Sequence, residues 1–270
     1  MTSLNCAGWD VGNVKTFDHF IARCGKITNI DTTGWNVGLN CENLNAIFHS
    51  YKGTTLDIRG WDTRNVTVFC QMFDACSNLT TIYGLNELDT SNAGDFTQFL
   101  WSTTGLEEMD LSKVDTTHVV DDYPLSANGS FGDGLSGMFA GGTHKNLKKL
   151  VLGNKFSFYG DGSLTEACSA VLPTTVSGYY YDIDGNQYTK EDIKAMENPA
   201  GTYYTTIALV EEAVKQAQYE TDDKKYMSLN SLRSYHDMHN AEIQAKLDAI
   251  QDSIDESEEL TVEEVMALFS

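Results

Sequence analysis

The residues that could do chemistry in this 270-residue chain are not arranged in any familiar catalytic pattern. No HExxH metalloprotease motif, Gly-x-Ser-x-Gly nucleophile elbow or glycine-rich phosphate loop is present. His19, His49, His118 and His144 are far apart and have no evident nucleophile partner. We therefore expect no catalytic residue, no cofactor and no enzymatic activity.

Metal binding is the other chemistry to consider. His236 and His239 are three residues apart, so in a trimeric helical bundle they could form rings at the axis, but tolerated polar positions in a helical seam are the favoured interpretation. Of the six cysteines, Cys24 and Cys76 occupy the same position in a repeat, and no CxxC pair suggests zinc. We predict free buried thiols and no metal site.

An acidic run that begins at Asp182 could suggest a calcium loop. An EF-hand started there needs glycine at its sixth position and a carboxylate at its twelfth, but the chain has Gln187 and Ile193. Asp184–Gly185 lies between two β-prone runs and instead favours a hairpin over residues 179–189 with a type I′ turn.

The elements that must carry these residues are set by a repeat. Trp9, Trp35 and Trp61 recur at intervals of 26 residues, each preceded by glycine and followed by Asp or Asn. Such a period is typical of a solenoid in which each unit stacks on the next. We expect these tryptophans to lie in the core.

The third unit predicts the conformation of one repeat. Leu56 and Ile58 alternate with Asp57 and Arg59, as in a short strand with one buried and one exposed face. The next apolar residues are three and four apart and predict one face of a short helix: Val66, Phe69 and Phe73. Each unit is therefore expected to be a strand, a turn and a short helix.

Five such units span roughly residues 4–156. The clearest sequence is Trp61-Asp62-Thr63-Arg64-Asn65-Val66 followed by Met72-Phe73-Asp74-Ala75-Cys76-Ser77-Asn78-Leu79. It resembles the BspA-like leucine-rich repeats of bacterial and phage surface proteins. The resemblance implies a leucine-rich-repeat solenoid that serves adhesion and ligand binding and not catalysis.

We therefore predict an α/β chain in three parts. Residues 1–158 form the BspA-like solenoid, and residues 159–206 form a β-containing cap with the hairpin. Residues 207–270, which contain neither Gly nor Pro, form an α-helical region with coiled-coil character.

This C-terminal region carries an apolar stripe at helical spacing, so we expect it to form a homo-oligomer, with a trimer favoured, or to dock on another protein. The closing helix could equally fold back on its own chain. The predicted oligomerisation or docking residues are Leu229, Leu232, His236, His239, Ile243, Leu247, Ile250, Ile254, Leu268 and Phe269.

The net charge of the chain limits the classes of partner that it can bind. The net charge of −21 makes nucleic acid and anionic membranes poor partners, and no apolar run is long enough to span a bilayer. Within the array, the insertion at 121–134 is the most loop-like stretch. Its Tyr123 and Phe131 are candidate ligand contacts, with an inert excursion as the alternative.

A surface-type repeat without a recognisable signal peptide suggests synthesis in the host cytoplasm and release by lysis. Residues 225–235 and 261–269 also resemble segments of phage structural proteins. The leading hypothesis is a virion fibre or decoration protein that binds a host surface protein or glycan, anchored to other virion proteins by its C-terminal helices. The alternative is a bacterial cell-surface adhesin or a fragment of one.

Overall fold

The computed structural model describes residues 2–119, 134–159 and 172–217. The chain divides into two compact units, Met1–Glu211 and Glu212–Ser270, and the fold described below is that of the first. It is a mixed α/β structure made mostly of sheet, with few helices and no closed barrel among the described residues.

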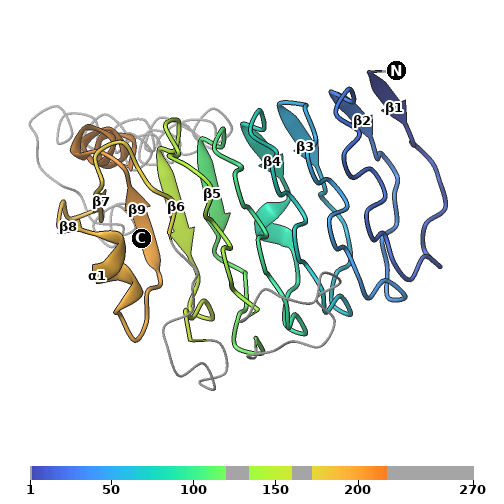
Figure 1. Cartoon of the computed structure of the whole chain (residues 1–270). Coiled ribbons are helices and arrows are strands. Elements are labelled where there is room, and N and C mark those ends of the chain that lie inside the picture. Colours follow the sequence, from blue (N-terminus) through green and yellow to red (C-terminus); the bar gives the residue numbers. More distant parts are fainter. Residues whose placement is uncertain (1, 120–133, 160–171, 218–270) are drawn as a thin grey trace, which may run out of the picture. The chain divides into compact units, whose positions relative to one another are not determined.

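Short parallel strands recur along the first unit and lie side by side (Figure 1). They are β1 (Ser3–Asn5), β2 (Asn29–Asp31), β3 (Thr55–Asp57), β4 (Thr81–Tyr83), β5 (Glu108–Leu111) and β6 (Lys149–Leu152). Ser3 pairs with Asn29 and Thr55 with Thr81, which is the predicted offset of 26 residues. Glu108 pairs with Lys149, so this offset grows to 41 residues across the predicted insertion.

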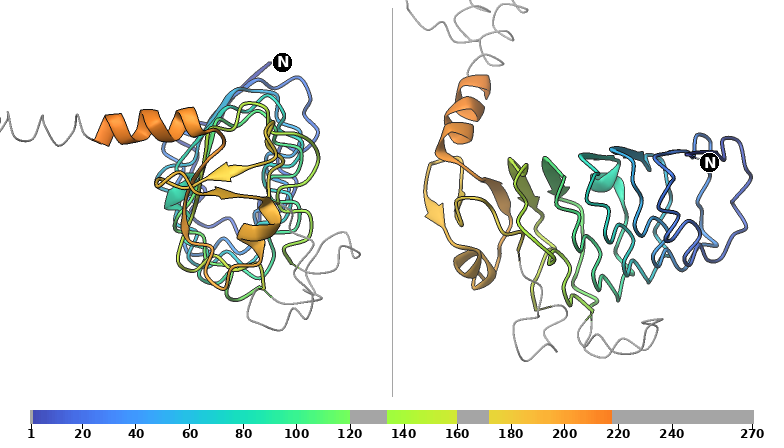
Figure 2. Two further views of the ribbon diagram at one scale, coloured as in Figure 1. Left: turned by 90° about the vertical axis from the view of Figure 1, so that its left-hand side faces the viewer. Right: turned by 45° about the horizontal axis from the view of Figure 1, so that its top comes forward.

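The chain between one strand and the next forms one rung. Five rungs are stacked in the described part of the chain: residues 2–27, 28–53, 54–79, 80–106, and 107–119 with 134–147. Backbone hydrogen bonds join them in sequence order. For example, Thr28 N donates to Thr2 O at 2.8 Å, and Thr80 N donates to Thr54 O at 2.8 Å. Viewed along the stack, the rungs superimpose (Figure 2).

The predicted helix in each repeat is wrong. In rung 3, alternate N–H groups donate to the next rung, as from Phe69 to Asp95 O at 2.8 Å and from Phe73 to Phe99 O at 3.0 Å. The intervening N–H groups close tight turns, such as Met72 N to Phe69 O. An α-helix would direct every N–H to the carbonyl four residues earlier in its own rung. The only helix in the described part of the array is the 3₁₀ turn η1 (Leu85–Glu87).

These consecutive turns impose left-handed backbone at two sites in each rung. Rung 3 has Gln71 at φ 54° and Ala75 at φ 58°, and rung 5 has Gly137 at φ 64° and Gly141 at φ 98° in the corresponding positions. A positive φ at the third residue is the signature of a type II turn, which favours glycine. Most rungs therefore have backbone strain at these sites, and hydrogen bonds between rungs offset it.

The residues expected on the helix face are nonetheless buried: Val66, Phe69 and Phe73 are each fully inaccessible. Phe73 stacks on Phe48, and Phe48 stacks on Trp61, so phenylalanine and tryptophan rings form a continuous column. The rings of Trp35 and Trp61 stack at 5.9 Å between centroids.

The prediction that all three repeat tryptophans lie in the core is wrong for Trp9. Trp9 is 48% exposed, whereas Trp35 and Trp61 are 5% and 6% exposed. A rung buries its tryptophan against both neighbours, and rung 1 has a neighbour on one side only among the described residues.

Beyond β6 the chain turns back and covers the last parallel strand. Strand β9 (Gly201–Tyr204) pairs antiparallel with β6, and β7 (Tyr180–Tyr181) joins the same sheet through β9. The short helix α1 (Lys190–Lys194) begins at a Thr189–Asp192 capping box. These elements close the C-terminal edge of the array.

The predicted hairpin is present, because β7 pairs antiparallel with β8 (Gln187–Tyr188). Its type I′ turn is wrong. That turn needs positive φ at both central residues, but Gly185 at φ 83° is the one residue of the described connection with positive φ. Asp182 holds the connection in place instead, because its carboxylate accepts hydrogen bonds from Asn186 N at 2.9 Å and from Tyr188 Oη at 2.9 Å.

Among the described cysteines, Cys6, Cys41, Cys70 and Cys76 are free and buried, as predicted. Cys24 is exposed, contrary to prediction, because it lies in the terminal rung. Residues 207–217 are helical, as predicted, with Val210 buried.

Candidate functional site

The outward side of the strands carries a polar surface, here called the strand face. Leu56 and Met109 point into the core, whereas the alternating neighbours point outward. The outward side chains of the first four strands are Ser3, Asn5, Asn29, Asp31, Thr55, Asp57, Thr81 and Tyr83. Seven of these eight side chains are polar and non-aromatic, and the eighth, Tyr83, adds an exposed aromatic ring.

A hollow of about 300 Å³ lies on this face between rungs 2 and 3. Asp31, Thr32 and Thr33 line it from rung 2, and Asp57 and Arg59 line it from rung 3, with the two buried tryptophans at its base. Thr32 Oγ1 donates to Asp57 O at 3.0 Å, which fixes the two rungs at this point. The hollow therefore exists only when neighbouring rungs stack in register.

The two carboxylates in the hollow are held in the ionised form. Hydrogen bonds from Thr33 lower the pKa of Asp31. Hydrogen bonds from Arg59, at 2.9 Å from Nε and 2.5 Å from a terminal nitrogen, lower the pKa of Asp57. Each carboxylate keeps lone pairs beyond those used in these bonds, so each can accept from a ligand hydroxyl.

Tyr83 adjoins the hollow and adds an apolar platform. The Arg59 guanidinium lies 5.2 Å from the centre of its ring, a cation–π arrangement, and Tyr83 stays 47% exposed. A second hollow of about 270 Å³ continues the strand face, lined by Thr80, Thr81, Ile82, Leu85, Asn86, Glu107, Glu108 and Asp110. Hydrogen-bond acceptors, hydrogen-bond donors and an aromatic ring are thus spread over the strand face from rung 2 to rung 5.

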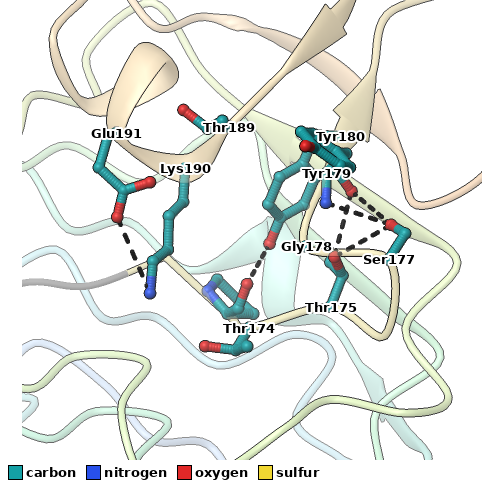
Figure 3. Close-up of a pocket in the computed structure, with 10 residues that line it drawn as sticks. Thr174, Thr175, Ser177, Gly178, Tyr179, Tyr180, Thr189, Lys190 and Glu191 are labelled. Carbon is teal, nitrogen blue, oxygen red and sulfur yellow. Dashed lines mark hydrogen bonds and ion pairs between the residues drawn. The ribbon is translucent and has the colours of Figure 1, made fainter.

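A third hollow, of about 220 Å³, lies in the cap and is lined mainly by hydroxyl-bearing side chains (Figure 3). Most of their polar atoms are used by the fold. Tyr180 Oη donates to Pro173 O at 2.6 Å, and Ser177 Oγ donates to Thr205 O at 3.1 Å. Lys190 stands at its edge with Glu191 Oε1 at 4.0 Å. We therefore attribute this hollow to the packing of the cap and not to ligand binding.

The histidines are dispersed in the structure as in the sequence. His49 Nδ1 lies 3.5 Å from Asp74 Oδ2, and burial lowers the pKa of His49 and raises that of Asp74 to about 6. Burial also lowers the pKa of His144 to about 4. Among the described residues, no group of three or more His, Cys, Asp or Glu side chains is placed to hold a metal ion.

The residues predicted for binding lie elsewhere. Tyr123 and Phe131 lie outside the described residues, as does every predicted oligomerisation or docking residue from Leu229 to Phe269. The strand-face hollow was not predicted as a site. Its signal was the alternation at residues 56–59, which put Asp57 and Arg59 opposite the core.

Residues 42–128 match the family model described as "Mycoplasma protein of unknown function, DUF285". The match covers about a third of the chain and is consistent with the BspA-like resemblance of the repeat. It does not include residues 225–235 or 261–269, so it gives no support to the expected resemblance of those segments to phage proteins. No curated protein and no solved structure matches the chain significantly. In the part of the chain that the structure describes, no helix has the length and apolarity needed to cross a membrane.

Proposed function

We propose that this chain is a non-enzymatic binding protein, a BspA-like leucine-rich solenoid that displays its strand face to a glycan on a host surface. The observation that carries the proposal is the hollow between rungs 2 and 3, which holds two ionised carboxylates and an arginine, with the exposed ring of Tyr83 beside that arginine. Sugar hydroxyls donate well to carboxylates, and the apolar face of a sugar ring packs on an exposed aromatic side chain.

The repetition of the face supports an extended ligand over a compact one. Two hollows lie on this face, one at rungs 2 and 3 and the other at rungs 4 and 5, and both contain carboxylates and threonine hydroxyls. A polysaccharide presents hydroxyls at regular intervals and could contact both. A host surface protein is the alternative ligand, and it would also meet a polar surface.

For the biological setting we propose a virion fibre or decoration protein, with a bacterial cell-surface adhesin as the alternative. The C-terminal helices would join it to other virion proteins or to further copies of itself. This part is supported by the two sequence resemblances in residues 225–235 and 261–269. Mass spectrometry of purified phage particles tests it: recovery of the chain in the particle supports the virion, and recovery with the cell envelope supports the adhesin.

Glycan binding is tested on an array of surface polysaccharides with the full chain and two variants. Tyr83→Ala removes the exposed ring, and Asp31→Asn removes a charge but keeps an oxygen that can accept from Thr33 N. Both should lower affinity about tenfold, the effect of roughly one hydrogen bond or ring contact. Ile183→Ala is the control, because Ile183 in the cap is also 47% exposed.

The expected pattern is weaker binding by both strand-face variants, with unchanged melting temperature and unchanged binding by the control. Equal binding by all four proteins would place the glycan elsewhere. Binding to no glycan on the array, with retention of a host surface protein that Tyr83→Ala weakens, would support the alternative ligand.

A further inference from the structure

The N-terminal end of the array presents an apolar surface, here called the end face. Trp9 is 48% exposed and Phe20 is 38% exposed. Their rings meet edge to face at 6.3 Å between centroids. They line a hollow of about 440 Å³ together with Asp10, Val11, Val14, Thr16, Phe17 and Trp35. The corresponding surface of every later rung is covered by the rung before it.

Side chains on the end face have counterparts that join rungs in the interior. Three side chains of later rungs donate to a carbonyl of the preceding rung: Trp35 Nε1 to Cys6 O at 2.9 Å, Asn40 Nδ2 to Gly12 O at 3.0 Å, and Cys76 Sγ to Phe48 O at 3.1 Å. Their counterparts in rung 1 are Trp9, Asn13 and Cys24. The end face therefore carries donors of the kind that bind a neighbouring rung.

The same face also carries backbone acceptors. N–H groups of rung 1 donate to carbonyls of rung 2, at Asn43, Asn45, Ile47 and His49. These carbonyls therefore point toward the N-terminal side of their rung. The equivalent carbonyls of rung 1 belong to Thr16, Asp18, Phe20 and Ala22, and accept no hydrogen bond from the described residues. A surface with both donors and acceptors can be complementary to itself.

Charge indicates which partner can approach this surface. Residues 1–26 contain two acidic and three basic side chains, a net charge of +1, which leaves −22 on the rest of the chain. Residues 27–53 and 54–79 each carry a net charge of −1, so the first three rungs are all nearly neutral. Two copies can therefore meet through the end face without placing a strong excess of like charge in the contact.

We propose that the end face is a self-association surface, on which a second copy of this chain docks head to head about a twofold axis. In such an isologous contact the same patch serves both copies, so the donors of one can meet the acceptors of the other. The exposed rings of Trp9 and Phe20 would form its apolar centre. The outer edge of β1, which pairs only with β2 among the described residues, would lie within it.

Sedimentation velocity of the full chain over a wide concentration range tests the proposal. The wild type should reach a species of twice the mass of its low-concentration form, whatever that form is. Trp9→Glu places a carboxylate in the contact and should abolish the doubling. Ile183→Glu, at a side chain of nearly equal exposure in the cap, should leave the doubling intact.

A wild type whose mass is independent of concentration up to about 1 mM would overturn the proposal, because an association weaker than this is negligible. A doubling that survives in folded Trp9→Glu would also overturn it. Glycan binding is tested with the strand-face variants and self-association with Trp9→Glu, so the failure of one proposal can be told from the failure of the other.

A second readout needs no variant. Cys24 is exposed in the single chain, and by the repeat register its thiol lies toward the end face. Its rate of alkylation, followed by peptide mass mapping, should fall at least fivefold as the wild type is concentrated. A rate per molecule that does not change across the concentrations at which the mass doubles would show that the second copy docks elsewhere.

Discussion

The aromatic column can be tested by removing the same residue type at two depths. Trp61 is 6% exposed, and its ring stacks against Trp35 at 5.9 Å and Phe48 at 6.0 Å. A buried aromatic side chain removes roughly 150–250 Å² from water, which corresponds to about 4–6 kcal/mol at about 25 cal/mol per Å². Alanine retains part of this, so we expect Trp61→Ala to lower the free energy of unfolding by about 3–5 kcal/mol.

Trp9→Ala is the matched control, because Trp9 occupies the same repeat position but is 48% exposed. With about half of its surface already in water, its loss should cost about 2 kcal/mol. Guanidinium unfolding followed by far-ultraviolet circular dichroism measures both, at a chain concentration low enough to exclude the proposed self-association. If Trp9→Ala is as costly as Trp61→Ala, stacking between rungs is not what stabilises the tryptophans.

Three further predictions concern the turns, the packing and the titration of the array. Arg23 is exposed and has φ 59°, so Arg23→Gly should be more stable than Arg23→Ala by about 1 kcal/mol in chemical denaturation, the reverse of the usual order. Gly105→Ala would place a methyl group 2.6 Å from Ser77 O and should cost about 1–3 kcal/mol, whereas Gly25→Ala meets nothing within 4 Å and should be neutral in the same assay. Burial raises the pKa of Asp74 from 3.8 to about 6, so its protonated form favours the folded state. Its contribution, up to about 3 kcal/mol, is present below pH 4 and lost as pH rises through 6, so urea titrations should show the wild type losing stability relative to Asp74→Asn over that range.

The sequence predicted the strands and their register better than the segments between them. The 26-residue period places Leu56 beside Ile82, and this pairing is observed. The spacing of Val66, Phe69 and Phe73 fits a helix face, but consecutive turns bury the same three side chains equally well. The two differ in whether an N–H bonds within its own rung or to the next, and the pattern of one repeat carries no information on that choice.

The candidate site shows the same division. Alternation along one strand predicts that Asp57 and Arg59 face outward, because side chains in a strand alternate between faces. That Asp31 lies across the hollow and Tyr83 lies beside Arg59 depends on the exact stacking of three rungs. A shift of register by one residue would send these side chains to the core side. The site is thus a property of the array and not of any single repeat.

The two ends of the array also follow from its construction. Each rung satisfies its backbone and its aromatic side chains through two neighbours, so both ends of a stack leave groups unsatisfied. At the C-terminal end, β9 pairs along β6 in antiparallel register and closes the edge from within the chain. At the N-terminal end, rung 1 has the same repeat residues as the other rungs but is paired on one side only among the described residues, and its Trp9 is half exposed. The same interactions that join rungs within the array therefore make its N-terminal end the surface best suited to join two arrays.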